Sequence, residues 1–235
     1  MIKHSLWSAV MLLVNQSEAS QTSFPQSGLL ALAEPNPGLR ILRREATIHI
    51  HAEQQIVTAL SGPDAADREE LEAFISHVFK RVHAADIKHF MPQLMSLRDQ
   101  QGQLLAVCGL RHAEDNQLFL ETYLDEPVEA TLSRNVGEPV ARRDIVEIGN
   151  LAVAQRSSIR SLLASVSLYL HSTAKQWAVF TGNPTLRNSM SKLNFPLEIL
   201  AQAKLDALPE HDRADWGRYY DEQPQVMAAR RKERF

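Results

Sequence analysis

The sequence predicts an α/β protein of the α+β kind, with a mixed sheet flanked by helices. Between residues 93 and 124, short strand-like runs alternate with polar turns, which predicts an antiparallel meander. Residues 143–161 then predict a buried strand, a short polar turn and an amphipathic helix. A further strand-like run follows that helix, and a helix crossing between two strands indicates a parallel pair.

Composition places the chain among ordinary globular proteins. Of its 235 residues, 44% are hydrophobic and 23% are charged, which is enough for one sizeable core. The formal net charge of −3 gives no general basic footprint, so we expect no nucleic-acid partner. The single cysteine, Cys108, lies in an apolar run, which excludes an internal disulfide framework and fits a reducing compartment. We therefore expect a cytoplasmic protein.

The N-terminus leaves one alternative to that location. Leu6 to Val14 is largely apolar, and secretion through this segment is the alternative. It is far shorter than the ~20 residues of a membrane helix, so we expect no transmembrane segment. Residues 21–38 are rich in Ser, Pro, Gln and Asn, which predicts a linker. The expected organisation is therefore an extension or linker at 1–37, partly disordered, one domain at 38–227, and a charged, frayed tail at 228–235.

The first elements of the domain are a strand and a helix. Gly38 to His51 favours an extended run, in which His49 and His51 share one face. Two histidines are too few for a metal site, and no other ligand pattern is present, so no metal is expected. A helix beginning near Asp64 or Asp67 runs to about His83. Its apolar stripe, which predicts core packing, contains Leu71, Phe74, Ile75, Val78 and Phe79.

Three strand-like runs follow in quick succession. They are expected at Gln93 to Arg98, Leu104 to Arg111 and Leu118 to Leu124, the third closed by a turn at residues 125–127. Val128 to Asn135 is expected to be a helix. The short polar connections favour neighbouring antiparallel strands.

The central strand contains a carboxylate that needs an explanation. Glu147 lies in an otherwise apolar run, where a charge is costly unless it is paired or used. One reading gives Glu147 a raised pKa and a role in handling a proton or an ammonium group. The other reading makes it structural, paired with Arg142, Arg143 or Arg111. Both readings stay open at this point.

The residues after Glu147 extend the candidate site. By simple alternation Glu147 and Asn150 fall on opposite strand faces, but Gly149 between them is a position for a bulge. Such a bulge brings both side chains toward one cleft. Ser157 or Ser158 then caps a helix whose apolar face contains Ile159, Leu162, Leu163, Val166 and Leu170. The start of such a helix presents backbone N–H groups to anions.

The rest of the chain completes the sheet. Trp177 to Phe180 is expected to be a strand, followed by a helix from Thr185 to Leu193. Asn183 precedes Pro184 and is a candidate for capping that helix. Leu197 to Met227 contains further strand-like and loop segments, with an aromatic cluster at residues 216–220.

The order of these elements resembles that of the GCN5-related acyltransferases. Residues 178–195, ending in Lys-Leu-Asn-Phe, look like a late strand and helix of that family. Several segments resemble the bacterial thermostable hemolysin family more closely, and together they span about 71–226. They are residues 106–111, 118–127, 146–152, 177–187 and 216–221, among which Glu-x-Gly-Asn-Leu-Ala and Leu-Asp-x-Pro are fairly specific. Glu147 and Asn150 also resemble the Glu-x-x-Arg strand of acyl-homoserine-lactone synthases, but Asn150 stands where those enzymes have arginine, so homoserine-lactone synthesis is not implied.

The resemblance implies roles for particular residues. It implies catalytic roles for Glu147 and Asn150. The donor thioester, acyl-CoA or an acyl-carrier protein, is implied to bind at Leu151, Val153, Arg156, Ser157, Ser158, Arg160, Ser161 and Asn183. A small-molecule amine acceptor is implied to bind near Arg111, Glu121, Tyr123 and Thr181. For Glu121 and for Asn183, local turn or capping chemistry is the competing explanation.

One departure bears on the donor. The family's pyrophosphate turn has glycines that let the backbone approach the phosphates, whereas residues 155–160 here read Gln-Arg-Ser-Ser-Ile-Arg. Arg156 and Arg160 add positive charge in compensation. A carrier protein, whose phosphopantetheine lacks the adenosine diphosphate end, tolerates the loss of glycine better than coenzyme A does.

These observations lead to one expected function and two alternatives. We expect an acyltransferase that moves an acyl group from a pantetheine thioester to an amine. The first alternative is a non-enzymatic membrane-active protein, as the family name suggests. The second is a degenerate acyltransferase fold kept for binding, which the missing glycines favour.

Overall fold

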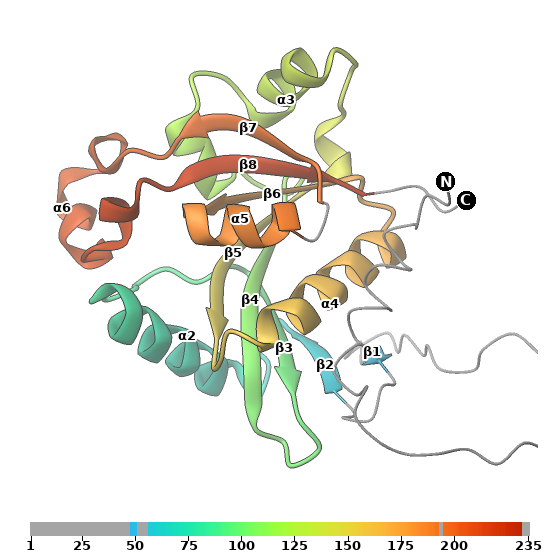
Figure 1. Ribbon diagram of the computed structural model, residues 1–235, viewed down its shortest axis with the longest axis vertical. Helices are drawn as coiled ribbons and strands as arrows, with labels where there is room; N and C mark the ends of the chain where they lie inside the picture. Colours follow the sequence, from blue (N-terminus) through green and yellow to red (C-terminus); the bar gives the residue numbers. More distant parts are fainter. Residues whose placement is uncertain (1–47, 51–55, 193–194, 232–235) are drawn as a thin grey trace, which may run out of the picture.

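A computed structural model describes residues 48–50, 56–192 and 195–231. Over these residues eight strands form one sheet in the order β1-β2-β3-β4-β5-β6-β8-β7 (Figure 1). The strands are β1 Ile48–Ile50, β2 Ile56–Ser61, β3 Gln93–Arg98, β4 Leu104–His112, β5 Ile145–Val153, β6 Trp177–Gly182, β7 Leu197–Gln202 and β8 Gln225–Arg230. The α-helices are α2 Arg68–His83, α3 Val128–Val136, α4 Ser158–Ser172, α5 Pro184–Lys192 and α6 Glu210–Arg213. The mixed sheet flanked by helices is thus confirmed.

Helices cover both faces of the sheet. On one face α4 and α5 pack against β3, β4, β5, β6 and β8, with Leu162, Val166 and Met190 in the core between them. On the other face α2 packs on β3, β4 and β5, while α3 packs on β5, β6 and β8. Of the expected apolar stripe, Leu71, Ile75, Val78 and Phe79 are buried there, and Phe74 is partly buried. Strand β5 therefore lies between two apolar layers, as its sequence indicates.

Pairing is antiparallel everywhere except between β5 and β6, which form the expected parallel pair around α4. The helices begin where the sequence indicates, at Arg68 after Asp67 and at Ser158 after Ser157. Neither Asp67 nor Ser157 makes a side-chain capping hydrogen bond, so that part of the expectation is wrong. Cys108 is fully buried, and burial raises the pKa of its thiol to about 12.

Two expected segments differ from the structure. The third strand of the meander is absent, because Phe119–Tyr123 forms a 3-10 helix. The charged tail also begins later than expected: β8 extends to Arg230, and Ala228 is fully buried beside β6 and β7. Of the expected strand at 38–51, Ile48–Ile50 is a strand. The rest of that stretch and the expectations for the N-terminal extension lie outside the described residues.

Gly217 lets the segment between β7 and β8 touch the end of α2. Its φ of +52° is a conformation that side chains rarely adopt. A Cβ at this position lies 2.4 Å from the carbonyl oxygen of His83. The next residue, Arg218, donates its backbone N–H to that same oxygen at 2.7 Å. A backbone contact this close requires glycine.

We expect Gly217→Ala to destabilise the protein by more than about 2 kcal/mol, because it combines a strained φ with a backbone clash. Gly102→Ala is a matched control for φ alone: at φ +80° with open space around it, it should cost about 1 kcal/mol. Gly62→Ala, with neither problem, should be close to neutral. Urea unfolding of the three variants measures this order, and equal losses for Gly217→Ala and Gly102→Ala would contradict it.

Candidate active site

The site begins where β5 and β6 separate. The two strands pair only over Ile145–Ile148 and Trp177–Phe180, although β5 continues to Val153 and β6 to Gly182. Figure 1 shows β5 continuing downward beside β4, while β6 turns away with β8 and β7. A cavity of about 420 Å³ occupies the opening. Its wall includes residues from β5, β6, α4 and α5 together with the C-terminal end of α2.

A bulge in β5 accompanies this separation. Gly109 pairs with Gly149 and Val107 with Ala152, so two residues, Asn150 and Leu151, lie opposite Cys108 alone. Asn150 has a φ of +45°, which asparagine tolerates better than most residues. The expected bulge is therefore present, one residue after Gly149. A bulge bends its strand, which carries β5 away from β6.

The bulge brings Glu147 and Asn150 to the same cavity, as expected. The Asn150 side chain is nevertheless already engaged. Its Oδ1 accepts the backbone N–H of Met91 at 2.9 Å, and its Nδ2 donates to the carbonyl of His89 at 3.2 Å. Asn150 therefore holds the loop before β3 against β5, and the structure gives it a positioning role in place of the expected contact with a substrate carbonyl.

Met91 fills the space above two facing glycines. A Cβ on Gly149 lies 2.3 Å from Met91 Cε, and a Cβ on Gly109 lies 2.6 Å from Met91 Cβ. Arg68 of α2 donates to the Met91 carbonyl at 2.8 Å, which fixes the loop from the other side. This explains the Gly-Asn pair of the strand: glycine admits the loop, and asparagine holds it. The loop, which nothing in its own sequence marked as functional, forms one wall of the cavity.

Glu147 lies in the cavity wall and is 3% exposed. Its two carboxylate oxygens accept the backbone N–H groups of Phe119 and Leu120, each at 2.9 Å. Arg111 approaches one of these oxygens to 4.0 Å. Burial raises the pKa of Glu147, and the two backbone hydrogen bonds oppose this shift. Glu147 thus holds the backbone at Phe119 and Leu120, and of the three arginines named as possible partners it lies near Arg111. It is also part of the cavity wall.

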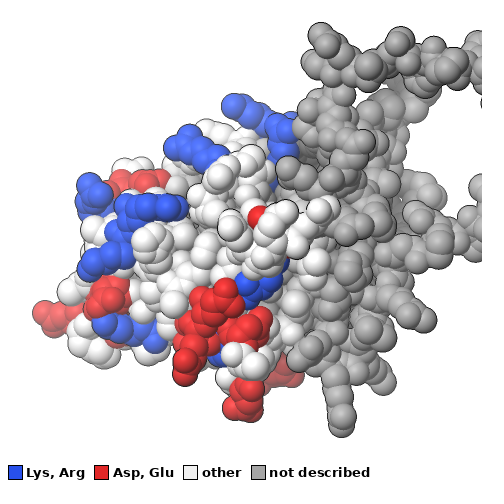
Figure 2. Space-filling view, turned by 90° about the horizontal axis from the view of Figure 1, so that it is seen from below, with Lys and Arg blue, Asp and Glu red and all other residues white. Residues whose placement is uncertain are grey.

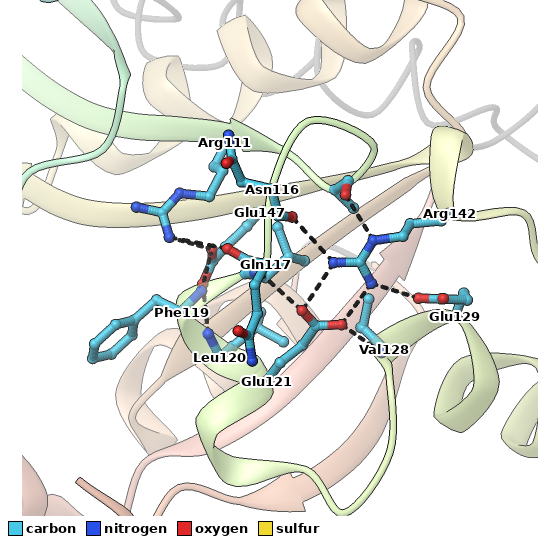
Figure 3. A network of polar contacts seen from close by, with 12 residues as sticks. Arg111, Asn116, Gln117, Phe119, Leu120, Glu121, Val128, Glu129, Arg142 and Glu147 are labelled. Atoms are coloured by element: carbon cyan, nitrogen blue, oxygen red, sulfur yellow. Dashed lines mark hydrogen bonds and ion pairs between the residues drawn. The ribbon is translucent and has the colours of Figure 1, made fainter. Parts of the chain in front are cut away.

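The second carboxylate of this region, Glu121, lies apart from the cavity. It accepts two hydrogen bonds from the guanidinium of Arg142, at 2.6 and 2.9 Å, and the backbone N–H groups of Leu118 and Val128. Figure 3 shows Arg142 reaching Glu121 while Arg111 reaches Glu147 from the opposite side. Glu121 thus fixes the loop that enters α3, and the expected contact with an acceptor is not what the structure gives it.

Four further residues that were expected to bind the acceptor or the donor thioester lie in the wall of the cavity. Arg111, Tyr123, Thr181 and Asn183 all line it. The Tyr123 and Tyr220 hydroxyls are hydrogen-bonded to one another, and burial raises the pKa of Tyr123, so this pair is neutral. Asn183 accepts the N–H of Leu186 at 2.9 Å, which is the capping role named as its alternative.

The turn before α4 contributes less than expected. Leu151, Val153 and Arg156 line the cavity, whereas Ser157, Ser158, Arg160 and Ser161 do not. The N–H of Ser158 bonds back to the carbonyl of Gln155 at 3.1 Å. In the described part of the chain neither Arg156 nor Arg160 has an acidic partner within ion-pair distance. Arg156 is therefore the cation of this turn that faces the cavity.

An aromatic wall lies at the other side of the cavity. It consists of Phe79, His83, Phe119, Tyr123, Trp216 and Tyr219. Phe119 stacks on Trp216 with ring centroids 5.6 Å apart, and Gly217 makes this approach of the chain possible. The run at 216–220 stood out in the sequence, but nothing there indicated that α2 would contribute His83. Burial lowers the pKa of His83, which therefore contributes a neutral imidazole at neutral pH.

Charges around the cavity are unevenly distributed. Among its described lining residues Glu147 is the one carboxylate, whereas Arg111, Arg156, Arg230 and Arg231 are cationic. On the face drawn in Figure 2, charged side chains surround a mostly uncharged middle, with basic and acidic ones mixed at the left and a mainly acidic cluster at the lower edge. Within residues 48–50, 56–192 and 195–231 no three His, Cys, Asp or Glu side chains gather as metal ligands. None of the helices in these ranges has the length and hydropathy needed to cross a membrane.

Comparison with known families settles the family. The thermostable hemolysin family matches residues 61–235, about three quarters of the chain. The chain belongs to the thermostable hemolysin family. This confirms the resemblance seen in the segments between 71 and 226. No curated protein sequence matches this family member significantly.

Solved structures similar to this thermostable hemolysin family member share its fold. The acyl-homoserine-lactone synthase LasI has a TM-score of 0.53 and 11% identity, over 76% of this chain and 91% of LasI. FeeM, an N-acyl amino acid synthase from uncultured soil microbes, has a TM-score of 0.51 and 14% identity, over 75% and 89%. BjaI, a CoA-dependent acyl-homoserine lactone synthase solved with SAM and isopentyl-CoA, has a TM-score of 0.50 and 10% identity, over 74% and 82%. The GCN5-related acyltransferase-like fold is therefore confirmed.

Glu121 should make stability depend on pH in the acid range. Burial of the Glu121 carboxyl raises its pKa, but hydrogen bonds from Arg142 and two backbone N–H groups outweigh this and hold the pKa at about 2. Because the folded pKa lies below the ordinary value of 4.5, the ionised carboxylate stabilises the fold above pH 4.5. That contribution is lost as the pH falls toward 2.

We expect Glu121→Gln to reduce the free energy of unfolding by ~1–3 kcal/mol at pH 6 and by much less near pH 2. Urea unfolding at both pH values measures the difference. Glu69→Gln, which removes an exposed carboxylate, is the matched control and should show little change at either pH. If Glu121→Gln lowers the free energy of unfolding equally at pH 6 and at pH 2, this explanation is wrong.

Proposed function

We propose that this protein transfers an acyl group from a pantetheine thioester, acyl-CoA or acyl-carrier protein, to a small-molecule amine. The observation that carries the proposal is the cavity opened by the separation of β5 and β6. The wall of this cavity contains four features: a cation just before α4, the unpaired edge of β5, an apolar channel between α4 and the sheet, and a buried carboxylate. Each of these features matches one part of the two substrates.

The strand edge and Arg156 match the donor. From Gly149 to Val153, β5 has no ladder partner on the β6 side within the described residues. Its free backbone groups are suited to the two amides of a pantetheine arm, which can pair as an added strand does. Arg156 lies at the end of this edge, where a charge-assisted bond to a phosphate is available. A phosphopantetheine carries one phosphate there, and coenzyme A carries more.

The apolar channel of the cavity has the length for a long acyl chain, far more than an acetyl group needs. It runs between α4 and the sheet and is lined by Ile159, Leu162, Leu163, Val166, Leu170, Ala178 and Phe180. From Ile159 to Leu170 the helix rises by roughly 16 Å. A fully extended chain on the order of 12 carbons spans that length. Burying such a chain is favourable by about 0.8 kcal/mol for each methylene group.

Glu147 matches the acceptor amine. In the reaction the amine nitrogen attacks the thioester carbonyl carbon, loses a proton, and the C–S bond breaks to release a thiol. Both Glu147 oxygens hold backbone N–H groups, yet each has a second lone pair. With its pKa raised by burial, the carboxylate is suited to accept the proton that the amine loses.

The test is a screen of acyl-thioesters from C2 to C16 against small amines, with release of free thiol as the readout. We expect turnover that increases toward the longer acyl chains and requires both substrates. Dye release from phospholipid vesicles, measured without thioester, examines the membrane-active alternative in parallel. Vesicle leakage together with no thiol release for any pair would overturn the proposal.

Arginine variants of the turn before α4 should separate the two donors. Arg156→Ala should raise KM for acyl-CoA by ~10-fold, because a charge-assisted phosphate contact is lost. Arg160→Ala is the matched control, since Arg160 lies close by in the first turn of α4 but does not line the cavity. It should change KM far less. An acyl-carrier-protein donor should be less sensitive to both changes. Equal effects of the two variants on acyl-CoA would show that only the general charge of the turn matters.

Variants of Glu147 should separate its two roles. Glu147→Gln places an amide donor against one of two backbone N–H donors, which should cost ~1–3 kcal/mol of stability. Glu147→Asp keeps the charge but shortens the reach of the carboxylate. We expect Glu147→Gln, assayed well below its melting temperature, to lower kcat by ~10²–10⁴-fold, the usual contribution of a general base. If the folded Glu147→Gln protein turns over like the parent, the carboxylate only supports the loop.

A further inference from the structure

Arg111 lies in the wall of the cavity with most of its hydrogen-bonding capacity unused. It is on β4, directly paired with Glu147 of β5, and its side chain is 25% exposed. Within the described residues its guanidinium makes one long hydrogen bond, to the carbonyl of Gln117 at 3.4 Å. Its one acidic neighbour there is Glu147 at 4.0 Å. A guanidinium has five N–H donors, so four remain available.

Arg142, in the same network, is an arginine whose hydrogen-bonding capacity is fully used. It donates five hydrogen bonds between 2.6 and 3.1 Å, which uses all its N–H groups. Its partners are two carboxylates, Glu121 and Glu129, and two backbone carbonyls. Figure 3 shows both arginines in one view. The contrast indicates that Arg142 holds the loop together, whereas Arg111 is available to something that enters the cavity.

Glu147 does not satisfy Arg111. The Glu147 carboxylate is engaged with the N–H groups of Phe119 and Leu120, which fix its position. At 4.0 Å from Arg111 it is too far for a hydrogen bond. The two groups therefore present a cation and a carboxylate side by side to the same cavity. This arrangement is complementary to a ligand with a carboxylate and an ammonium group close together.

Arg111 is also separate from the cation at the donor end. Glu147, its strand partner, lies six residues before Val153, which at ~3.3 Å per residue is on the order of 20 Å along β5. Arg156 lies beyond that strand end. A phosphate bound by Arg156 would therefore lie too far away to reach Arg111. Arg111 is thus a cation distinct from the one at the donor end of the cavity.

We infer that the acceptor is an apolar α-amino acid whose carboxylate is bound by Arg111 and whose amino group lies toward Glu147; this rests on the proposed acyl transfer. In an α-amino acid the nitrogen and the carboxyl carbon are ~2.5 Å apart, which suits a cation and a carboxylate on adjacent strands. Guanidinium and carboxylate match in a bidentate geometry. The neighbouring aromatic wall, with Phe119 stacked on Trp216, is suited to an apolar side chain.

The test compares L-phenylalanine with its amide and with 2-phenylethylamine, which lack the carboxylate but keep the amine and the ring. With a long-chain acyl-CoA donor we expect kcat/KM for L-phenylalanine to exceed both by ~10–10²-fold. Arg111→Gln should raise KM for L-phenylalanine far more than KM for the two analogues that lack a carboxylate, and so remove this preference. Arg111→Lys should retain part of the preference. Arg134→Gln, which removes a surface arginine paired with Glu126, is the control and should change nothing.

A binding measurement keeps this inference separate from the proposed function. L-phenylalanine should raise the melting temperature of the parent protein, and the amide should not. In Arg111→Gln the shift with L-phenylalanine should vanish.

If thiol is released with amines but the three compounds react equally, or if Arg111→Gln keeps the preference, the inference is wrong and acyl transfer stands. If inorganic phosphate gives an Arg111-dependent shift and L-phenylalanine gives none, Arg111 belongs to a phosphate site. If no donor–amine pair releases thiol, the proposed function fails, and the binding data still decide the role of Arg111.

Discussion

The carboxylate of Glu147 is the contact on which the surrounding structure depends. It lies in the middle of the sheet, where an unpaired charge is unfavourable, and it is stabilised by two backbone N–H groups at the start of a 3-10 helix. Those bonds determine where Phe119 lies, and Phe119 stacks on Trp216 from the far end of the chain. One buried acid thus connects the central strand, the loop above it and the aromatic wall of the cavity.

The site combines side chains that use their hydrogen bonds to fix loops with arginines that have few hydrogen-bond partners. Glu121 and Arg142 use nearly all their hydrogen-bonding capacity on each other and on the backbone, which fixes the loop before α3. Asn150 and Arg68 do the same for the loop before β3. Arg111 and Arg156 remain with few partners among the described residues, and both face the cavity. Fixed surroundings and available charges are the arrangement that a binding site requires.

Some local signals were overridden by contacts distant in sequence. Leu118 to Leu124 is rich in apolar and aromatic residues, including Phe and Tyr, which favours a strand. It forms a 3-10 helix because Glu147 and the side chain of Glu121 accept its backbone N–H groups. Arg230, with its charged neighbours, indicated a frayed end, yet the preceding alanines pair with β6 and β7. These alanines are small enough to be buried in β8 between β6 and β7, and composition alone does not show that the chain forms a strand there.

The sequence by itself determined most of the order of strands and helices, the mixed sheet, the burial of Cys108 and the family. These follow from apolar periodicity and from motifs, both of which are local. It also singled out Glu147 and the bulge beside it, because a charge in a buried strand stands out without any structure. It did not indicate β2, and it predicted a strand where Phe119–Tyr123 forms a 3-10 helix. The tertiary structure alone decided which of the marked residues share one cavity: Arg156 and not Arg160, Arg111 and not Glu121. That selection depends on where β5 and β6 separate and on which donors are already used, and both are set by contacts between residues far apart in the chain.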